Sequence, residues 1–102
     1  MKLDFRYRYV DNKKVLVKYS GASPEVILPE DVKEIGSGAF YNCTSLQSVI
    51  ILEGVTRIES EAFRGCTSLQ SVVIPEGVTE IGSSAFSGCT SLQSVVIPEG
   101  VE

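Results

Sequence analysis

The chain of 102 residues is long enough for one compact domain and too short for two ordinary ones. Its composition, 43% hydrophobic and 22% charged, is typical of a folded protein and excludes a disordered chain. No apolar run is long enough to span a bilayer, which excludes membrane insertion, and the N-terminus MKLDFRYRYV lacks the features of a secretory signal. The sequence therefore predicts a cytoplasmic protein if the chain is full length, or otherwise a mature fragment whose signal has been removed.

The net charge of −4 is unevenly distributed along the chain. Residues 1–20 contain six basic and two acidic side chains, a net charge of +4. Residues 21–102 contain three basic and eleven acidic side chains, a net charge of −8. Because phosphate binding requires a basic face, this acidic body argues against nucleic acid as a partner. The basic segment is interpreted as the solvated face of a hairpin, with contact to an anionic surface as the alternative.

The first 25 residues have the pattern of a β-hairpin with one apolar face. Apolar and aromatic residues alternate with polar ones over residues 3–9 and again over residues 15–19. Asp11-Asn12 offers a turn between the two strands, and SGASP at 20–24 links the hairpin to the segment that follows.

The rest of the chain repeats every 23 residues, and the stretch GCTSLQSVVIPEG occurs unchanged at 65–77 and 88–100. The units are residues 26–48, 49–71 and 72–94, followed by a partial fourth unit at 95–102. A fixed period of this length predicts a solenoid, in which each unit buries its apolar face against its neighbours. We therefore assign residues 26–102 to a solenoid and residues 1–25 to an N-terminal β-hairpin cap that covers its first unit.

Each unit is expected to contain a strand, a turn, a shorter strand and one turn of helix. In one such strand, Val72 and Ile74 share the inward face, while Ser71 and Val73 point outward. Residues that tolerate a left-handed turn follow the strand in each copy: Asp31, Gly54, Gly77 and Gly100. Helix start and stop signals come next, first the serines Ser37, Ser60 and Ser83, then Asn42, Gly65 and Gly88.

The pattern L-x-x-V-x-I-P-x-x-V-x-x-I-x-x-x-A-F-x-x-C, present in full at residues 69–89, resembles the leucine-rich repeat of the BspA-like (treponemal) type. The resemblance implies an α/β, β-rich leucine-rich-repeat solenoid, with a parallel β-sheet on the concave side and short helical turns on the convex side. It also implies a bacterial cell-surface or secreted protein that acts in adhesion or protein binding.

Few residues could carry chemistry. The chain has no histidine, which excludes a Cys–His nucleophile pair and any metal site that needs histidine. The carboxylates of the turns form a column of equivalent positions rather than an unequal catalytic pair: Glu30, Glu53, Glu76 and Glu99. The sequence predicts no enzyme, no cofactor and no metal ion. Calcium bound to the glutamate column is the less favoured alternative to a solvated turn.

The three cysteines, Cys43, Cys66 and Cys89, occupy one position of the repeat. In a stacked solenoid they would form a ladder with neighbours about 5 Å apart, close enough for a disulfide. We expect buried free thiols, because free cysteine packs as a small hydrophobic residue. A disulfide, or a metal ion held with a further ligand, is the alternative.

The outward positions of the predicted sheet form the candidate binding surface on its concave face. Each unit contributes a glutamine, a serine and a branched aliphatic residue: Gln47, Ser48 and Ile50, then Gln70, Ser71 and Val73, then Gln93, Ser94 and Val96. Such a flat, weakly charged and partly apolar surface suits contact with a host or bacterial surface protein. Alternatively, the aliphatic residues only satisfy strand propensity.

The partial fourth unit points to a second function. Val95, Ile97 and Val101 would be covered on one side only if the chain stops at Glu102. The chain is then predicted to be a structural unit that self-assembles by burying Leu92, Val95 and Ile97 against another copy. A fragment of a longer surface protein is the competing explanation.

Overall fold

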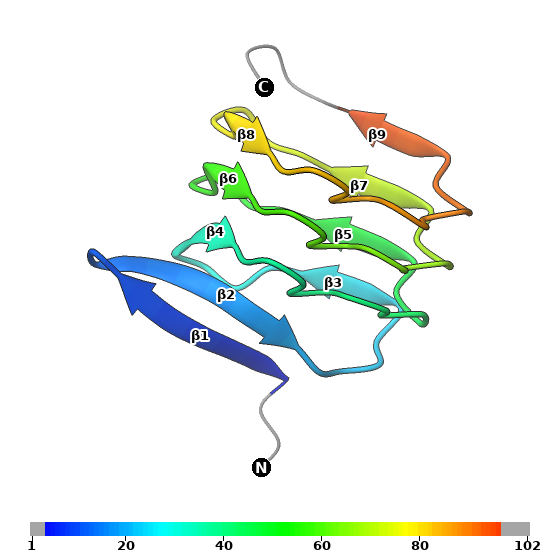
Figure 1. Ribbon diagram of the computed structural model, residues 1–102, viewed down its shortest axis with the longest axis horizontal. Coiled ribbons are helices and arrows are strands. Elements are labelled where there is room, and N and C mark those ends of the chain that lie inside the picture. Colours follow the sequence, from blue (N-terminus) through cyan, green and yellow to red (C-terminus); the bar gives the residue numbers. More distant parts are fainter. Residues whose placement is uncertain (1–3, 97–102) are drawn as a thin grey trace.

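Two β-sheets form the described part of the molecule and enclose its core (Figure 1). The computed structural model of the chain describes residues 4–96, apart from the side chains of Ser94 and Val96. The mixed sheet has the order β1-β2-β4-β6-β8, with β1 (Phe5–Val10), β2 (Lys13–Tyr19), β4 (Val32–Ile35), β6 (Arg57–Ile58) and β8 (Glu80–Ile81). The parallel sheet has the order β3-β5-β7-β9, with β3 (Glu25–Ile27), β5 (Ser48–Ile50), β7 (Ser71–Val73) and β9 (Ser94–Val96).

The 23-residue period sets the register of both sheets. In the parallel sheet each residue pairs with the one 23 positions later, so that Val49 lies between Val26 and Val72. Strands β4, β6 and β8 of the mixed sheet pair in parallel with the same offset. Equivalent residues therefore stack on one another along the molecule. The predicted leucine-rich-repeat solenoid with a parallel β-sheet is confirmed.

The N-terminal hairpin belongs to the mixed sheet alone. β1 and β2 are antiparallel, and their two-residue turn has left-handed backbone at Asp11 (φ 52°) and Asn12 (φ 66°), as a type I′ turn requires. β2 then pairs in parallel with β4, where it takes the place of the short strand of a preceding unit. Among the described strands, β3 remains the first of the parallel sheet. The division of the chain into a cap and a solenoid stays a prediction.

The predicted helical turns are wrong, because within residues 4–96 hydrogen bonds between units replace them. The Phe40 N–H donates to the Ala62 carbonyl of the next unit at 2.7 Å, and the Asn42 N–H donates to the Arg64 carbonyl at 2.7 Å. The intervening Tyr41 N–H donates only to a carbonyl three residues back. Alternate amides are thus committed to the neighbouring unit, so a continuous intrahelical ladder cannot form.

The local signals for a helix also serve other purposes. Ser37, expected to cap a helix, donates its hydroxyl to the Ser60 carbonyl of the next unit at 3.0 Å. Left-handed residues interrupt each of these segments near its middle: Gly38, Glu61 and Ser84. The part of the chain that the structure describes accordingly has no helix long and apolar enough to cross a membrane.

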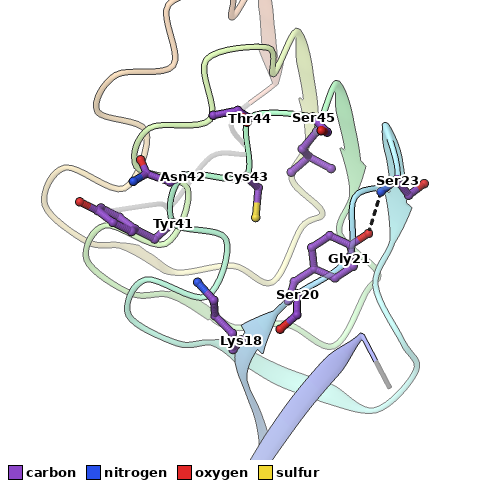
Figure 2. A pocket seen from close by; sticks show the side chains of 11 residues that line it. Lys18, Ser20, Gly21, Ser23, Tyr41, Asn42, Cys43, Thr44 and Ser45 are labelled. Carbon is purple, nitrogen blue, oxygen red and sulfur yellow. Dashed lines mark hydrogen bonds between the residues drawn. The ribbon is translucent and has the colours of Figure 1, made fainter. Parts of the chain in front are cut away.

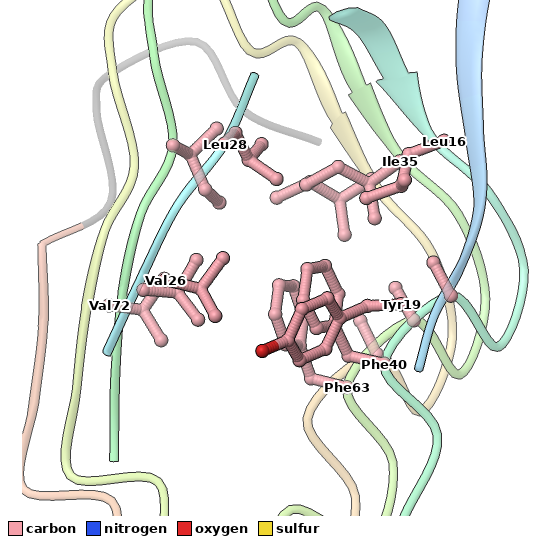
Figure 3. Close-up of a cluster of buried hydrophobic side chains, with 14 of the residues drawn as sticks. Leu16, Tyr19, Val26, Leu28, Ile35, Phe40, Phe63 and Val72 are labelled. Atoms are coloured by element: carbon pink, nitrogen blue, oxygen red, sulfur yellow. The ribbon is translucent and has the colours of Figure 1, made fainter. Parts of the chain in front are cut away.

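The core lies between the two sheets and is built from rows of stacked side chains (Figure 3). Phe63 lies between Phe40 and Phe86, with ring centroids 4.8 and 5.3 Å apart and nearly parallel planes. Tyr19 of the hairpin continues this row, 5.4 Å from Phe40. Figure 3 shows Val26 and Val72 of the parallel sheet facing the rings. The hairpin thus supplies the aromatic ring that a preceding unit would contribute.

Candidate binding surface

The outer face of the parallel sheet carries a row of exposed aliphatic side chains, which we call the aliphatic column. In each strand the middle residue is buried and its two neighbours point outward. Ile27, Ile50 and Val73 are 63%, 44% and 52% exposed. Their backbones pair directly, Ile27 with Ile50 and Ile50 with Val73, so neighbouring members are about 4.8 Å apart.

The structure places the other predicted surface residues beside this column. The glutamines are exposed and the described serines are half-buried: Gln47, Gln70 and Gln93, with Ser48 and Ser71. Ser94 pairs with Ser71 and Val96 with Val73, which continues the register, although their side chains lie outside the description. At the end of the stack, Leu92 and Val95 are half-buried, and Ile97 lies outside the described residues.

Sequence reasoning missed the first strand of this surface. In β3, Ile27 takes the place that Ile50 has in β5, and Glu25 takes the place of Ser48. Ile27 is the most exposed member of the aliphatic column, because it lies on the first strand of the sheet. Subtracting one period of 23 residues from Ile50 would have identified it.

Negative charge lies beside the aliphatic column. The segments that build this sheet and its turns, residues 23–31, 46–54, 69–77 and 92–96, contain no lysine or arginine. They contain five acidic residues: Glu25, Glu30, Asp31, Glu53 and Glu76. Glu30, Glu53 and Glu76 are exposed, one per repeat, and we call them the acidic row.

The acidic row lies three residues beyond the aliphatic column along each unit. Among the described residues, none of its three carboxylates forms an ion pair. Lys33 extends its ammonium group to Gly54 beside the row, also without an ion pair. The row therefore presents solvated negative charge that a cationic partner could neutralise.

The outer face of the mixed sheet differs, because its charges neutralise one another. Glu34, Arg57 and Glu80 stand in register on β4, β6 and β8. Arg57 pairs with Glu80 at 3.0 Å, and Glu34 lies 4.0 Å from the ammonium group of Lys13 in the hairpin. The uncompensated and partly apolar surface is therefore the outer face of the parallel sheet.

The three cysteines form a ladder of free thiols, and the expected burial holds for Cys66 alone. Cys66 is fully buried, whereas Cys43 and Cys89 at the ends of the ladder are half-buried. The Cys66 thiol donates to the Phe40 carbonyl at 3.0 Å, and the Cys89 thiol donates to the Phe63 carbonyl at 3.2 Å. These bonds to the preceding unit explain why cysteine, rather than an aliphatic residue, occupies the position.

The position of each thiol along the ladder decides its acidity. Hydrogen bonding to Cys43 and burial both raise the pKa of Cys66. Burial also raises the pKa of Cys89. The neighbouring Cys66 thiol, which can turn its proton to a Cys43 thiolate, lowers the pKa of Cys43 against the opposing effect of burial, and the charge of Lys18 contributes to the lowering.

Cys43 lines a polar pocket of about 240 Å³ at the start of the ladder (Figure 2). The pocket lies between the end of the hairpin, with Lys18, and the turn that contains Tyr41 and Asn42. It brings together hydroxyl, amide and ammonium groups but no pair of carboxylates. Within residues 4–96, no group of three histidine, cysteine or acidic side chains is placed to hold a metal ion.

The family model of the BspA type leucine rich repeat region (6 copies) matches residues 18–102. The chain belongs to this BspA-type family. BspA-type repeats generally form protein-interaction or adhesion modules, are generally non-enzymatic and are typical of surface or secreted proteins. No curated protein matches this BspA-type chain.

Solved structures share the fold of this BspA-type chain. It is 33% identical to the leucine rich repeat protein TpLRR of T. pallidum over 97% of its length, with a TM-score of 0.93. It is 26% identical to a leucine-rich repeat protein of Bacteroides ovatus over 100% of its length, with a TM-score of 0.83. A leucine rich cell surface protein of Faecalibacterium prausnitzii is 26% identical over 99% of the chain, with a TM-score of 0.54. The chain spans 50%, 30% and 43% of these three proteins.

Proposed function

We propose that the chain is a protein-binding or adhesion module of a bacterial surface-type protein, and that it binds through the outer, concave face of the parallel sheet. The aliphatic column is the observation that carries this proposal. Ile27, Ile50 and Val73 expose apolar surface in one continuous row. Apolar side chains gathered on a regular surface are typical of a site that a partner covers.

The pattern of burial supports a surface rather than a catalytic site. The described serines of the sheet are half-buried strand residues, and the carboxylates beside the column are exposed and equivalent. Recognition by such a surface depends on shape and on the few apolar side chains at its centre. Ile50 lies at the centre of the column, between Ile27 and Val73, and is expected to contribute most to binding.

The double substitution Ile50→Asp/Val73→Asp is expected to abolish adhesion while the chain remains folded. Two carboxylates in the aliphatic column would have to be desolvated when a partner covers it, which costs free energy. The measurement counts beads coated with the chain on monolayers of cultured epithelial cells. Circular dichroism of the same preparations checks that the variant is folded.

The control is Thr67→Asp/Thr90→Asp, which adds the same charge at two exposed threonines outside the strands of the parallel sheet. Beads coated with this control should adhere like the unmodified chain. Binding through the aliphatic column would be contradicted if Ile50→Asp/Val73→Asp left adhesion intact. It would also be contradicted if both double variants reduced adhesion equally.

A structural, self-assembling unit is the second candidate function, and the last described repeat favours it. Phe86, Cys89, Leu92 and Val95 are half-buried, whereas the residues at the same positions one repeat earlier are buried. A second copy that packs on this row would bury apolar surface, as a further repeat would. The predicted interface residue Ile97 lies outside the described residues.

Sedimentation equilibrium at micromolar concentration tests this second function. If the chain assembles through this row, the mass should be at least that of two chains, and Leu92→Glu should reduce it to one. Gln93→Glu adds the same charge at the adjacent exposed residue and should leave the mass unchanged. A mass of one chain for the unmodified protein, without aggregation, would exclude self-assembly under these conditions.

A further inference from the structure

We propose that the partner segment is an extended, cationic peptide that crosses the strands of the parallel sheet, with apolar side chains on the aliphatic column and lysine or arginine beside the acidic row. This inference rests on the proposed function and names the chemistry of its partner. Charge complementarity carries it, because the four segments that form this sheet and its turns hold five acidic residues and no basic ones.

The spacing of the sheet favours a particular backbone conformation in the partner. Neighbouring strands are about 4.8 Å apart, so every second member of the aliphatic column is about 9.6 Å away. A polyproline II segment rises about 3.1 Å per residue with three residues per turn, so every third side chain returns to the same side after about 9.3 Å. The two repeats match closely. Two apolar side chains three residues apart in such a segment can therefore meet Ile27 and Val73 and enclose Ile50 between them.

The same geometry directs the neighbouring side chains toward the acidic row. In a three-fold helix, the residue after each apolar contact points about 120° away from it, which is sideways along the strands of the sheet. Glu53 is three residues beyond Ile50, at most about 10 Å along an extended chain. The long stem of lysine or arginine bridges such a distance while its charged group stays solvated.

The edge of the sheet is less available than its face. Ser23 donates its hydroxyl to the Glu25 carbonyl at 2.8 Å and accepts from the Glu25 N–H at 3.4 Å, which engages the backbone of β3. Pro24 and Pro29 flank this strand and have no N–H to donate. Addition of a partner strand to β3 is therefore obstructed, and the partner is expected to cross the face instead.

A second copy of the chain fits this face less well than a cationic peptide. The same face of a second copy is equally acidic and free of lysine and arginine in its sheet segments, so it offers the acidic row no positive charge. The hairpin of another copy is basic, but Lys13 is paired with Glu34, and Lys14 covers the ring of Tyr7 at 4.2 Å. Three of the four aromatic rings of that hairpin, Phe5, Tyr7 and Tyr19, also pack against its own core.

Three labelled peptides test the proposal by fluorescence anisotropy: three repeats of Pro-Val-Lys, three repeats of Pro-Val-Glu and three repeats of Pro-Ser-Lys. The Pro-Val-Lys peptide should bind most tightly, and the other two should bind at least about tenfold more weakly. Raising the salt concentration from about 20 mM to about 300 mM should weaken Pro-Val-Lys binding, because solvated charges are screened.

Matched variants locate the charge effect. Glu53→Gln/Glu76→Gln should weaken Pro-Val-Lys binding about fivefold, a typical effect of losing two exposed ion pairs. The control Glu59→Gln/Glu80→Gln removes the same amount of charge at the mixed sheet, where Glu80 lies on β8 and Glu59 directly follows β6. It should change Pro-Val-Lys binding less than about twofold. Equal weakening by both pairs would show that only net charge matters and would overturn the proposal.

The remaining outcomes separate this inference from the proposed function. Ile50→Ser/Val73→Ser should weaken Pro-Val-Lys binding without adding charge. The Pro-Val-Glu peptide could bind as tightly as Pro-Val-Lys and lose affinity in this variant. The aliphatic column would then be the binding surface, but the partner would not have to be cationic. If Ile50→Ser/Val73→Ser changes no binding, the proposed function fails as well. If the Pro-Val-Lys peptide does not bind at about 1 mM, the proposal of a peptide partner is wrong. It is also wrong if the chain forms a dimer that dissociates in the Glu53→Gln/Glu76→Gln variant, because the partner of the surface is then a second copy.

Discussion

Replacing Phe63 with alanine is expected to lower the free energy of unfolding by about 3–5 kcal/mol, a typical cost for a fully buried aromatic residue. Phe63 is completely buried and stacks on Phe40 and Phe86, so its removal leaves a cavity in the middle of the core and breaks two ring contacts. Domains of this size have about 5–15 kcal/mol of stability, so the loss is a large part of the total. Urea unfolding followed by circular dichroism measures it.

Two further variants make this prediction specific to burial between two units. Phe86→Ala removes the same ring where it is half-buried, and its cost is expected to be about half as large. Tyr41→Ala removes an exposed aromatic ring and should change stability by less than about 0.5 kcal/mol. If Phe63→Ala costs no more than Phe86→Ala, stacking between neighbouring units is not the main source of stability.

The second large effect is a loss of stability in alkaline solution caused by the Cys66 thiol. Its pKa is raised in the folded chain, so it keeps its proton at a pH where the unfolded chain has lost it. Stability is therefore complete below the unfolded pKa of about 8.5 and falls above it by about 1.4 kcal/mol per pH unit. The expected loss between pH 7 and pH 10 is about 2 kcal/mol, measured by urea unfolding in a reducing buffer.

The other two cysteines affect this pH profile in opposite ways. The pKa of Cys89 is also raised and adds to the loss, but less because this thiol is half-buried. The pKa of Cys43 is lowered, so its stabilisation increases up to the unfolded pKa and then stays constant. Cys66→Ala should destabilise the chain at every pH yet remove most of the alkaline loss. An unchanged pH dependence in this variant would show that another group is responsible.

The period of the sequence was sufficient to predict the register of the parallel sheet. Val49 and Val72 occupy equivalent positions 23 residues apart, and both are buried when the units stack with equivalent positions aligned. The backbones of Val49 and Val72 therefore pair with each other. The same reasoning predicted the left-handed backbone at Gly54 and Gly77, with φ of 105° and 103°. These features depend on residues within one unit and on its nearest copy, which a repeat displays directly.

The helical turns were predicted wrongly because the sequence signals for a helix are local, whereas the hydrogen bonds that replace the helix join neighbouring units. Ser60 and Gly65 would suit the ends of a short helix, but the Glu61 N–H and the Gly65 N–H donate to Ser83 and Ser87 of the next unit. Hydrogen bonds between units satisfy the same donors and add cohesion along the stack. Sequence patterns within one unit do not contain that information.

The sequence by itself determined the repeat, the inward and outward faces of each strand, and the absence of histidine chemistry. Only the tertiary structure showed that the hairpin extends the mixed sheet and leaves β3 as the first strand of the parallel sheet, which explains why Ile27 is so exposed. It also showed which charges are paired: those of the mixed sheet are, and the acidic row is not. The reason is physical, since side-chain periodicity is set by neighbours along the chain, whereas pairing depends on which segments meet in space.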